Sequence, residues 1–148
     1  MIRAAAKNYK DVVAIIDPSD YDLIIEELKN NKGTSLETRQ YLAAKVFQYT
    51  AYYDSLISSY FNKIESIDFP NILNLSFKDK KELRYGENPH QSAAFYRESD
   101  NLEGTIAGGI QLHGKELSFN NINDSNGALE ILKGFEEPTI VAVKHANP

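Results

Sequence analysis

Two short apolar runs stand out along this chain. Residues 12–16 (VVAII) and residues 139–143 (TIVAV) each span five positions with almost no polar side chain. A continuous run of this length is typical of a strand that is covered on both faces, as in a parallel sheet. The pattern therefore predicts an α/β fold in which each run is a buried strand.

The stretch between residues 17 and 60 follows a helical period instead. Apolar positions in residues 21–28 recur at i, i+3, i+4 and i+7, and Asn30–Gly33 provides a stop. Residues 34–37 (TSLE) resemble a capping box, and the apolar stripe over residues 42–60 then continues the helix to about seven turns. We predict two helices and expect the tyrosines of the second one to pack in the core.

The pattern changes again after residue 62. Asn and Pro residues interrupt the helical period, which places a domain boundary near Asp68–Asn71. Residues 73–77 (LNLSF) alternate with period two and predict a half-buried strand. Further on, Asn123 or Asp124 can cap a helix whose apolar face lies within residues 128–135.

The chain supplies few neighbours for its two predicted buried strands. A parallel strand needs a partner on each edge and cover on both faces. The run at residues 139–143 is followed only by KHANP, and no strand is predicted ahead of the run at residues 12–16. We therefore expect the sequence to be cut at both ends.

Composition narrows the class of protein further. Hydrophobic residues make up 42% of the 148 positions and charged residues 25%, which is typical of a globular protein. The net charge of -5 and the scattered basic residues argue against a nucleic-acid partner. There is no cysteine, and the three histidines lack a metal-binding spacing, so no metal site is predicted. No apolar run approaches the roughly 18 residues that span a membrane, so we expect a cytoplasmic protein without a membrane partner.

One candidate for chemistry is the pair Lys144 and His145. Both directly follow the run at residues 139–143, and ligands of open α/β sheets bind beyond the carboxyl ends of strands. An imidazole can move protons near neutral pH, and a neighbouring lysine can stabilise developing negative charge. The alternative is that both are polar residues at the start of a loop.

Two further candidates depend on basic side chains. Arg84 and Tyr85 open the polar segment RYGENPHQ (residues 84–91), where a guanidinium suits a phosphate and a hydroxyl adds a donor. The alternative is a polar connection between two strands. Arg3 and Lys7 lie at i and i+4 on one side of a predicted helix, and the alternative there is a solvated basic edge.

Several stretches of the chain, taken together, resemble one family. They occur in the family's order, and the fourth and the last are the most specific. The stretches are IRAAAKN (Ile2–Asn8), DPSDY (Asp17–Tyr21), SLETRQYLAAKVF (Ser35–Phe47), LRYGENPHQ (Leu83–Gln91), LHGKELSFNNIND (Leu112–Asp124) and VAVKHANP (Val141–Pro148). The family is the bifunctional AICAR transformylase / IMP cyclohydrolase of purine biosynthesis, and the resemblance spans nearly the whole chain.

The resemblance implies two domains. Residues 1–69 resemble the C-terminal part of the cyclohydrolase domain, whose methylglyoxal-synthase-like fold is a parallel sheet with helices. Residues 70–148 resemble the N-terminal part of the transformylase domain, whose α/β fold is similar to that of cytidine deaminase. The family's complete proteins are several times longer than this chain.

The resemblance also implies catalytic residues. His145 matches the residue that accepts the proton of the AICAR amine during formyl transfer, and Lys144 matches the residue that stabilises the transition state. Lys7 matches a lysine that acts in ring closure, whereas Arg3 has no such match. The formyl donor would be the cosubstrate 10-formyltetrahydrofolate, and neither reaction requires a metal or a redox cofactor.

Substrate-binding residues and partners are implied in the same way. Arg84 and Tyr85 match residues that bind the AICAR nucleotide, and Asn121 matches a further nucleotide contact. The expected small-molecule partners are AICAR and its formylated product FAICAR, and the family implies a homodimer. Because parts of both domains are missing, we expect the chain alone to catalyse neither reaction. The alternative function is a non-catalytic nucleotide-binding or interface module that keeps the fold.

Overall fold

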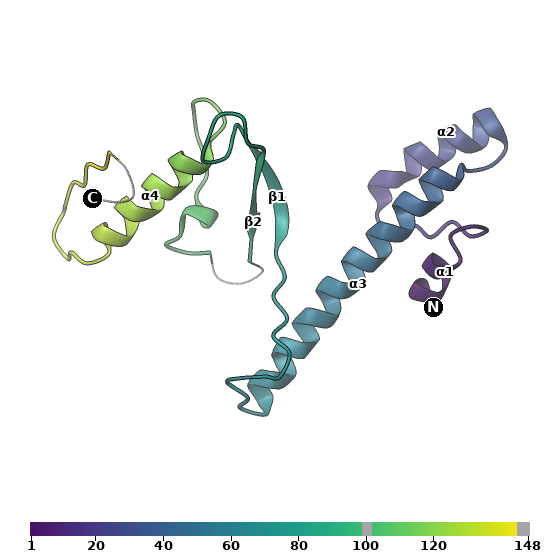
Figure 1. Ribbon diagram of the computed structural model, residues 1–148, viewed down its shortest axis with the longest axis horizontal. Coiled ribbons are helices and arrows are strands. Elements are labelled where there is room, and N and C mark those ends of the chain that lie inside the picture. Colours follow the sequence, from purple (N-terminus) through teal and green to yellow (C-terminus); the bar gives the residue numbers. More distant parts are fainter. Residues whose placement is uncertain (99–101, 145–148) are drawn as a thin grey trace. The chain divides into compact units, whose positions relative to one another are not determined.

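The computed structural model describes residues 1–98 and 102–144, and the chain divides into two compact units. The first unit is Met1–Ser76 and the second is Phe77–Pro148. The described part of the first unit is helical, and that of the second combines a small sheet with helix (Figure 1). At this level the α/β class predicted from the sequence is confirmed.

Helices make up the regular structure of the first unit. α1 spans Ile2–Lys7, α2 spans Tyr21–Asn31 and α3 spans Leu36–Ile64, while a single 3-10 turn at Pro18–Asp20 precedes α2. The two helices predicted from the apolar stripes correspond to α2 and α3, so both predictions are confirmed.

The capping box predicted over residues 34–37 is wrong, because α3 begins at Leu36 and is capped one residue later than Thr34. Ser35 is the N-cap, and its hydroxyl accepts a hydrogen bond from the Thr38 N–H at 3.0 Å. The reciprocal acceptor comes from α2 rather than from Glu37, because Glu27 accepts from the Ser35 N–H at 2.9 Å and from the Thr38 hydroxyl at 2.6 Å. The cap therefore also joins α2 to α3.

An ion cluster fastens the turn before α2 to the middle of the first unit. The Lys45 ammonium on α3 lies 2.6 Å from Asp20 and 3.2 Å from Asp17. Asp20 is buried, so the ammonium pairs a carboxylate that would otherwise lack a counter-charge away from water. The hydrogen bond with Asp20 raises the pKa of Lys45, and hydrogen bonds from Ser19 and then Lys45 lower the pKa of Asp17 to about 2.

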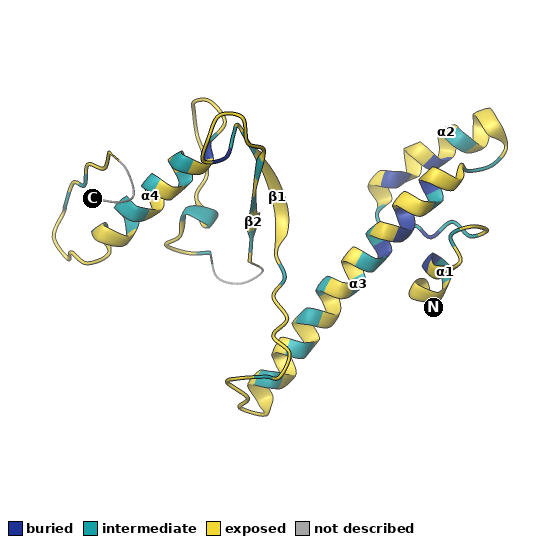
Figure 2. Ribbon diagram, viewed as in Figure 1, coloured by how far each residue is buried: buried dark blue, intermediate teal, exposed yellow. Residues whose placement is uncertain are grey.

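The core of the first unit lies where α1 and the segment before α2 meet the N-terminal half of α3 (Figure 2). Its buried apolar side chains are mostly small. They are Ala6, Ala14, Ile24, Leu42, Ala43 and Val46. Small side chains let the short helix α1 approach α3 closely.

The strand predicted over residues 12–16 is wrong. This segment has no regular secondary structure, although Ala14 is buried and Ile16 packs against the core. A strand needs a neighbour for its main-chain N–H and C=O groups, and the described residues of the first unit contain no strand. The apolar run packs against helices instead, so the predicted parallel sheet is absent from this unit.

The C-terminal half of α3 is mostly exposed to solvent (Figure 2). Tyr49, Tyr53 and Tyr60 each expose more than half of their surface, at 61%, 57% and 61%. The expectation that these tyrosines pack in a core is therefore wrong. The segment around residues 74–76 contacts this half of the helix through Ser55 and Ser58, but it leaves the three tyrosines exposed. Within residues 1–98 and 102–144, no helix is long and apolar enough to cross a membrane.

The second unit is built on an antiparallel strand pair. β1 (Lys78–Leu83) pairs with β2 (Ala93–Arg97), and α4 covers Phe119–Leu132 (Figure 1). A short 3-10 turn at Ile106–Gly108 lies between the sheet and α4 in the sequence. The connection between the two strands carries several of the candidate residues.

Two strand predictions fail in and near the second unit. Residues 73–77 have no regular structure, and the nearest strand begins only at Lys78. Residues 139–143 form no strand either, and Ile140 is 96% exposed. Both runs have the apolar content of a strand, but neither pairs with another strand among the described residues.

Candidate functional site

The segment that contains Arg84 and Tyr85 is the connection between β1 and β2. The polar connection between two strands that the sequence offered as the alternative is therefore present. It does not exclude a binding role, because loops that join strands often carry functional residues. The loop is closed by hydrogen bonds from the Gly86 N–H to the Gln91 carbonyl (2.8 Å) and from the Gln91 N–H to the Asn88 carbonyl (3.0 Å). A side chain at Gly86 would meet Gln91 atoms at 3.0 and 3.2 Å, so glycine suits this close approach.

Main-chain hydrogen bonds attach this loop to the start of α4. The Arg84 N–H donates to the Leu117 carbonyl at 2.9 Å, and the Phe119 N–H donates to the Tyr85 carbonyl at 3.1 Å. The Asn120 side chain adds a bond to the Glu87 carbonyl at 3.1 Å. The loop and the helix N-terminus are therefore held in one arrangement.

Ser118 lies at the centre of this arrangement and is completely buried. It is the N-cap of α4, and its hydroxyl accepts from the Asn121 N–H at 3.3 Å. The Asn121 side-chain oxygen in turn lies 3.1 Å from the Ser118 N–H and 3.0 Å from its hydroxyl, which completes a capping box. The prediction that Asn123 or Asp124 caps this helix is wrong, because the helix begins with the earlier Ser118 cap.

Tyr85 joins the same group of side chains. A hydrogen bond with Ser118 and a second one with Arg84 lower the pKa of the Tyr85 hydroxyl. The Arg84 guanidinium lies 5.0 Å from the Tyr85 ring centroid, and its Nη2 lies 3.4 Å from the hydroxyl. Arg84, Tyr85 and Asn121 are thus brought together, directly or through Ser118.

Sequence reasoning missed Ser118. The residues SFNN (118–121) place a hydroxyl side chain three positions ahead of an amide, which is close to the capping-box spacing. Asparagine in place of glutamate or glutamine at the third helical position hides the motif. A capping-box pattern that also allows asparagine at the third helical position includes Ser118 and Asn121.

A cavity of about 590 Å³ lies beside the Arg84 side of the strand connection. Its lining is largely polar and includes Lys80, Arg84, His90 and Tyr96. The lining also contains Glu82, which pairs with Lys80 at 2.9 Å, so Arg84 and the Tyr96 hydroxyl are the donors that suit an anionic ligand group. Tyr85, Ser118 and Asn121 do not line this cavity. Arg84 lines it and also contacts Tyr85, so this side chain connects the cavity with the hydrogen bonds around Ser118.

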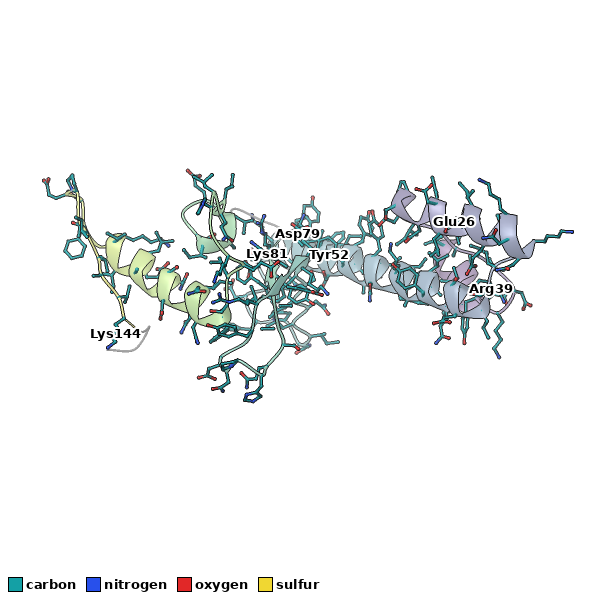
Figure 3. The ribbon with its side chains drawn as sticks, turned by 90° about the horizontal axis from the view of Figure 1, so that it is seen from above. Glu26, Arg39, Tyr52, Asp79, Lys81 and Lys144 are labelled. Atoms are coloured by element: carbon teal, nitrogen blue, oxygen red, sulfur yellow. The ribbon has the colours of Figure 1, made fainter. Side chains whose placement is uncertain are left out.

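The proposed catalytic pair near the C-terminus is described only in part. Lys144 is exposed in the segment beyond α4 (Figure 3). His145 lies outside the described residues. No hydrogen bond or ion pair of the described chain joins Lys144 to Arg84 or Tyr85.

The third candidate belongs to the other unit. Lys7 is in the last turn of α1 and is exposed. Arg3, one turn earlier, forms an ion pair with Asp54 at 2.9 Å. Across residues 1–98 and 102–144, no group of histidine, aspartate or glutamate side chains could hold a metal ion.

Comparison with known proteins identifies close relatives. The AICARFT/IMPCHase bienzyme family model matches residues 5–148. The chain is 59% identical over 149 residues to the bifunctional purine biosynthesis protein PurH of Acetivibrio thermocellus, and 57% identical over 148 residues to the PurH protein of a Thermoanaerobacter species. Each alignment covers 100% of this chain and 29% of the relative. The chain therefore spans less than a third of the length of these curated relatives.

Proposed function

Because the chain belongs to the AICARFT/IMPCHase bienzyme family, we propose that it is a segment of an enzyme that makes IMP in two steps. The first step transfers a formyl group from 10-formyltetrahydrofolate to AICAR and gives FAICAR. The second step closes the FAICAR ring to IMP with loss of water. We place the enzyme in the cytoplasm, as a homodimer that acts on small molecules only.

Each step is assigned to a different part of the chain. Residues 1–69 are proposed as the C-terminal part of a methylglyoxal-synthase-like cyclohydrolase domain, and residues 70–148 as the N-terminal part of a cytidine-deaminase-like transformylase domain. The division into two compact units at Ser76 and Phe77, a few residues from the proposed boundary, supports this assignment. In this proposal the strands of the cyclohydrolase sheet, and the further strands of the transformylase sheet, belong to the rest of the longer protein.

The observation that carries the proposal is the grouping of Arg84, Tyr85 and Asn121 around the start of α4. Arg84 offers a guanidinium beside a polar cavity, which suits the phosphate of AICAR. The Tyr85 hydroxyl lies 3.4 Å from the Arg84 guanidinium, so the two side chains could bind one ligand group together. The Asn121 oxygen is used within the helix cap, so its amide N–H groups remain the donors that would face the nucleotide.

The proposed formyl transfer needs a base and a cation. The AICAR amine forms a bond to the formyl carbon, its proton passes to the His145 imidazole, and the bond from that carbon to the folate nitrogen breaks. The departing folate nitrogen takes up a proton, so the charges balance. Lys144 would stabilise the oxyanion that develops on the formyl oxygen.

The proposed ring closure uses Lys7. The carboxamide nitrogen of FAICAR attacks the formamide carbon and gives up one proton. The formamide nitrogen gives up a second proton as the ring C=N bond forms, and the formamide oxygen leaves with two protons as water. An ammonium beside that oxygen can supply the proton that its departure requires. Lys7 carries such a group on an exposed face of α1.

The full-length protein and the 148-residue chain can be assayed side by side for both reactions. We expect the full-length protein to formylate AICAR and to cyclise FAICAR, and the chain alone to do neither. Isothermal titration with AICAR then tests the nucleotide contacts: Arg84→Gln in the full-length protein should weaken binding about 10-fold or more, as the loss of a charge-assisted hydrogen bond implies. Unchanged AICAR affinity would contradict the assignment. If the chain alone binds AICAR and the longer protein has neither activity, the alternative of a non-catalytic binding module is favoured.

A further inference from the structure

The guanidinium of Arg39 is bound almost entirely by main-chain oxygens. Its Nε donates to the Tyr9 carbonyl at 2.9 Å, and one terminal nitrogen donates to the Lys10 carbonyl at 2.9 Å. The other terminal nitrogen donates to both the carbonyl and the hydroxyl of Thr34. Arg39 lies near the start of α3, where Figure 3 labels it, so it ties two distant segments to that helix.

The first of these segments directly follows α1. The Asp11 and Val12 N–H groups both donate to the Asn8 carbonyl, at 3.0 and 2.9 Å, so the chain turns tightly after the helix. Arg39 binds the carbonyls inside this turn, two and three residues beyond Lys7. It therefore fixes the end of α1 from which the Lys7 side chain projects.

The helix α1 depends on such external contacts. It has only six residues, and Met1 at its N-cap provides no side-chain hydrogen bond. Helices this short are unstable without tertiary contacts. Ala6 supplies one contact, because it is fully buried in the core cluster.

The remaining ion pair of α1 contributes little. Arg3 and Asp54 expose 55% and 61% of their side chains, and exposed pairs of this kind stabilise proteins only weakly. The packing of Ala5, Ala6 and Tyr9 against the core is apolar and therefore non-directional. The hydrogen bonds of Arg39 add directional contacts at the Tyr9 and Lys10 carbonyls.

We propose that Arg39 is a positioning residue for ring closure, which it serves by holding the end of α1 so that Lys7 faces the substrate. This inference rests on the proposed role of Lys7 in cyclisation. Arg39 itself contacts no reacting atom in this account. A displacement of about 1 Å at a reacting group can cost on the order of 100-fold in rate, so a loosened α1 should be visible in kcat.

The test uses the full-length protein with Arg39→Gln, and with Arg3→Gln as a matched control on the same helix. Each sample is assayed for cyclisation of FAICAR and, as an internal reference for folded protein, for formylation of AICAR. Arg39→Gln should lower the kcat of cyclisation about 30- to 100-fold. Its KM should change less than about threefold, and formylation should stay within about twofold of wild type. Arg3→Gln should leave both reactions within about twofold, because its ion pair is exposed.

A conservative variant separates positioning from folding. Arg39→Lys keeps the charge but cannot hold all of these carbonyls at once, so we expect an intermediate loss of about 5- to 10-fold in the kcat of cyclisation. If Arg39→Gln does not fold, Arg39→Lys decides the question. Wild-type kcat in the folded variant, or a parallel loss of both reactions, overturns the proposal.

A Lys7→Ala variant distinguishes failure of this inference from failure of the proposed function. If Lys7→Ala cyclises FAICAR normally, the role of Lys7 is refuted, and the positioning role of Arg39 falls with it. If Lys7→Ala abolishes cyclisation while both Arg39 variants keep it, only the positioning role is refuted. Loss in Lys7→Ala together with the graded loss in the Arg39 variants supports both.

Discussion

The two units hold their candidate residues in different ways. In Met1–Ser76, charged side chains fasten short segments onto a core of buried apolar side chains, as Arg39 and Lys45 do. In residues 77–98 and 102–144, no hydrophobic side chain is buried, and the buried Ser118 joins the strand connection to α4 by hydrogen bonds. In the first unit, the buried core residues are different from the candidate catalytic residue Lys7, which is exposed. In the second unit, the candidate residue Asn121 is itself part of the cap that holds the structure together.

This contrast has a consequence for substitutions. In the first unit, a substitution at Leu42 of α3 should lower stability and leaves the exposed Lys7 itself unchanged. In the second unit, a change at the Ser118 cap should alter both the helix and the properties of Tyr85.

Core substitutions should separate the two units most clearly. Leu42 is 1% exposed, so Leu42→Ala should lower the free energy of unfolding by about 2–5 kcal/mol. Leu132 in α4 is only partly buried, and Leu132→Ala should cost about 1 kcal/mol. Urea denaturation followed by circular dichroism measures both. Equal losses for the two variants would contradict the claim that only the first unit has a packed core.

Removing the ammonium of the ion cluster should have the next largest effect. Lys45→Met leaves the Asp20 carboxylate, whose side chain is 8% exposed, without its charged partner. We expect the free energy of unfolding to fall by about 2–3 kcal/mol. Lys29→Met on the exposed side of α2 is the control and should stay within about 0.5 kcal/mol. If the two variants behave alike, the cluster does not fasten the turn to α3.

A cap substitution in the second unit should change helix and site together. Ser118→Ala removes the α4 N-cap, which should cost about 1 kcal/mol. It also removes the hydrogen bond that contributes most to the lowered pKa of Tyr85, so this pKa should rise towards its ordinary value. Denaturation and an NMR titration of labelled tyrosine measure the two effects. Ser125→Ala, at an exposed position in α4, is the control for both, and an unchanged Tyr85 pKa in Ser118→Ala would refute the link.

The smallest expected effect is a pH dependence in the first unit. The folded pKa of Asp17, about 2, lies below its ordinary value of 3.8, so the folded state binds this proton more weakly than the unfolded state. The stabilisation is therefore present above pH 3.8 and is lost as the pH falls towards 2. Asp17→Asn should remove this part of the slope in a plot of unfolding free energy against pH. A variant curve parallel to that of wild type between those pH values would contradict the assignment.

The sequence predicted helices better than strands in this chain. The apolar stripes of α2 and α3 are local features, so they could be found from spacing alone. The apolar runs at residues 12–16 and 139–143 show that such side chains favour burial, but pairing depends on partners elsewhere. Glu27, which completes the Ser35 cap from another helix, could not be found for the same reason.

Part of the candidate site could likewise be predicted from local sequence, and part could not. The residue types of Arg84 and Tyr85 suggested a binding role from sequence, and the structure brings them close to Asn121. The contribution of Ser118 was not predicted, because it depends on the strand connection lying against the start of α4. The hydrogen bonds of Arg39 to Tyr9 and Lys10 likewise join segments about 30 positions apart and carry no local pattern.

We propose that this one chain contributes to two separate active sites. The most direct test measures both reactions in the full-length protein with Lys7→Ala and, separately, with His145→Ala. We predict that Lys7→Ala lowers FAICAR cyclisation by at least about 100-fold and leaves AICAR formylation within about twofold, and that His145→Ala does the reverse. Parallel loss of both reactions in either variant, or no loss in both, would contradict the account.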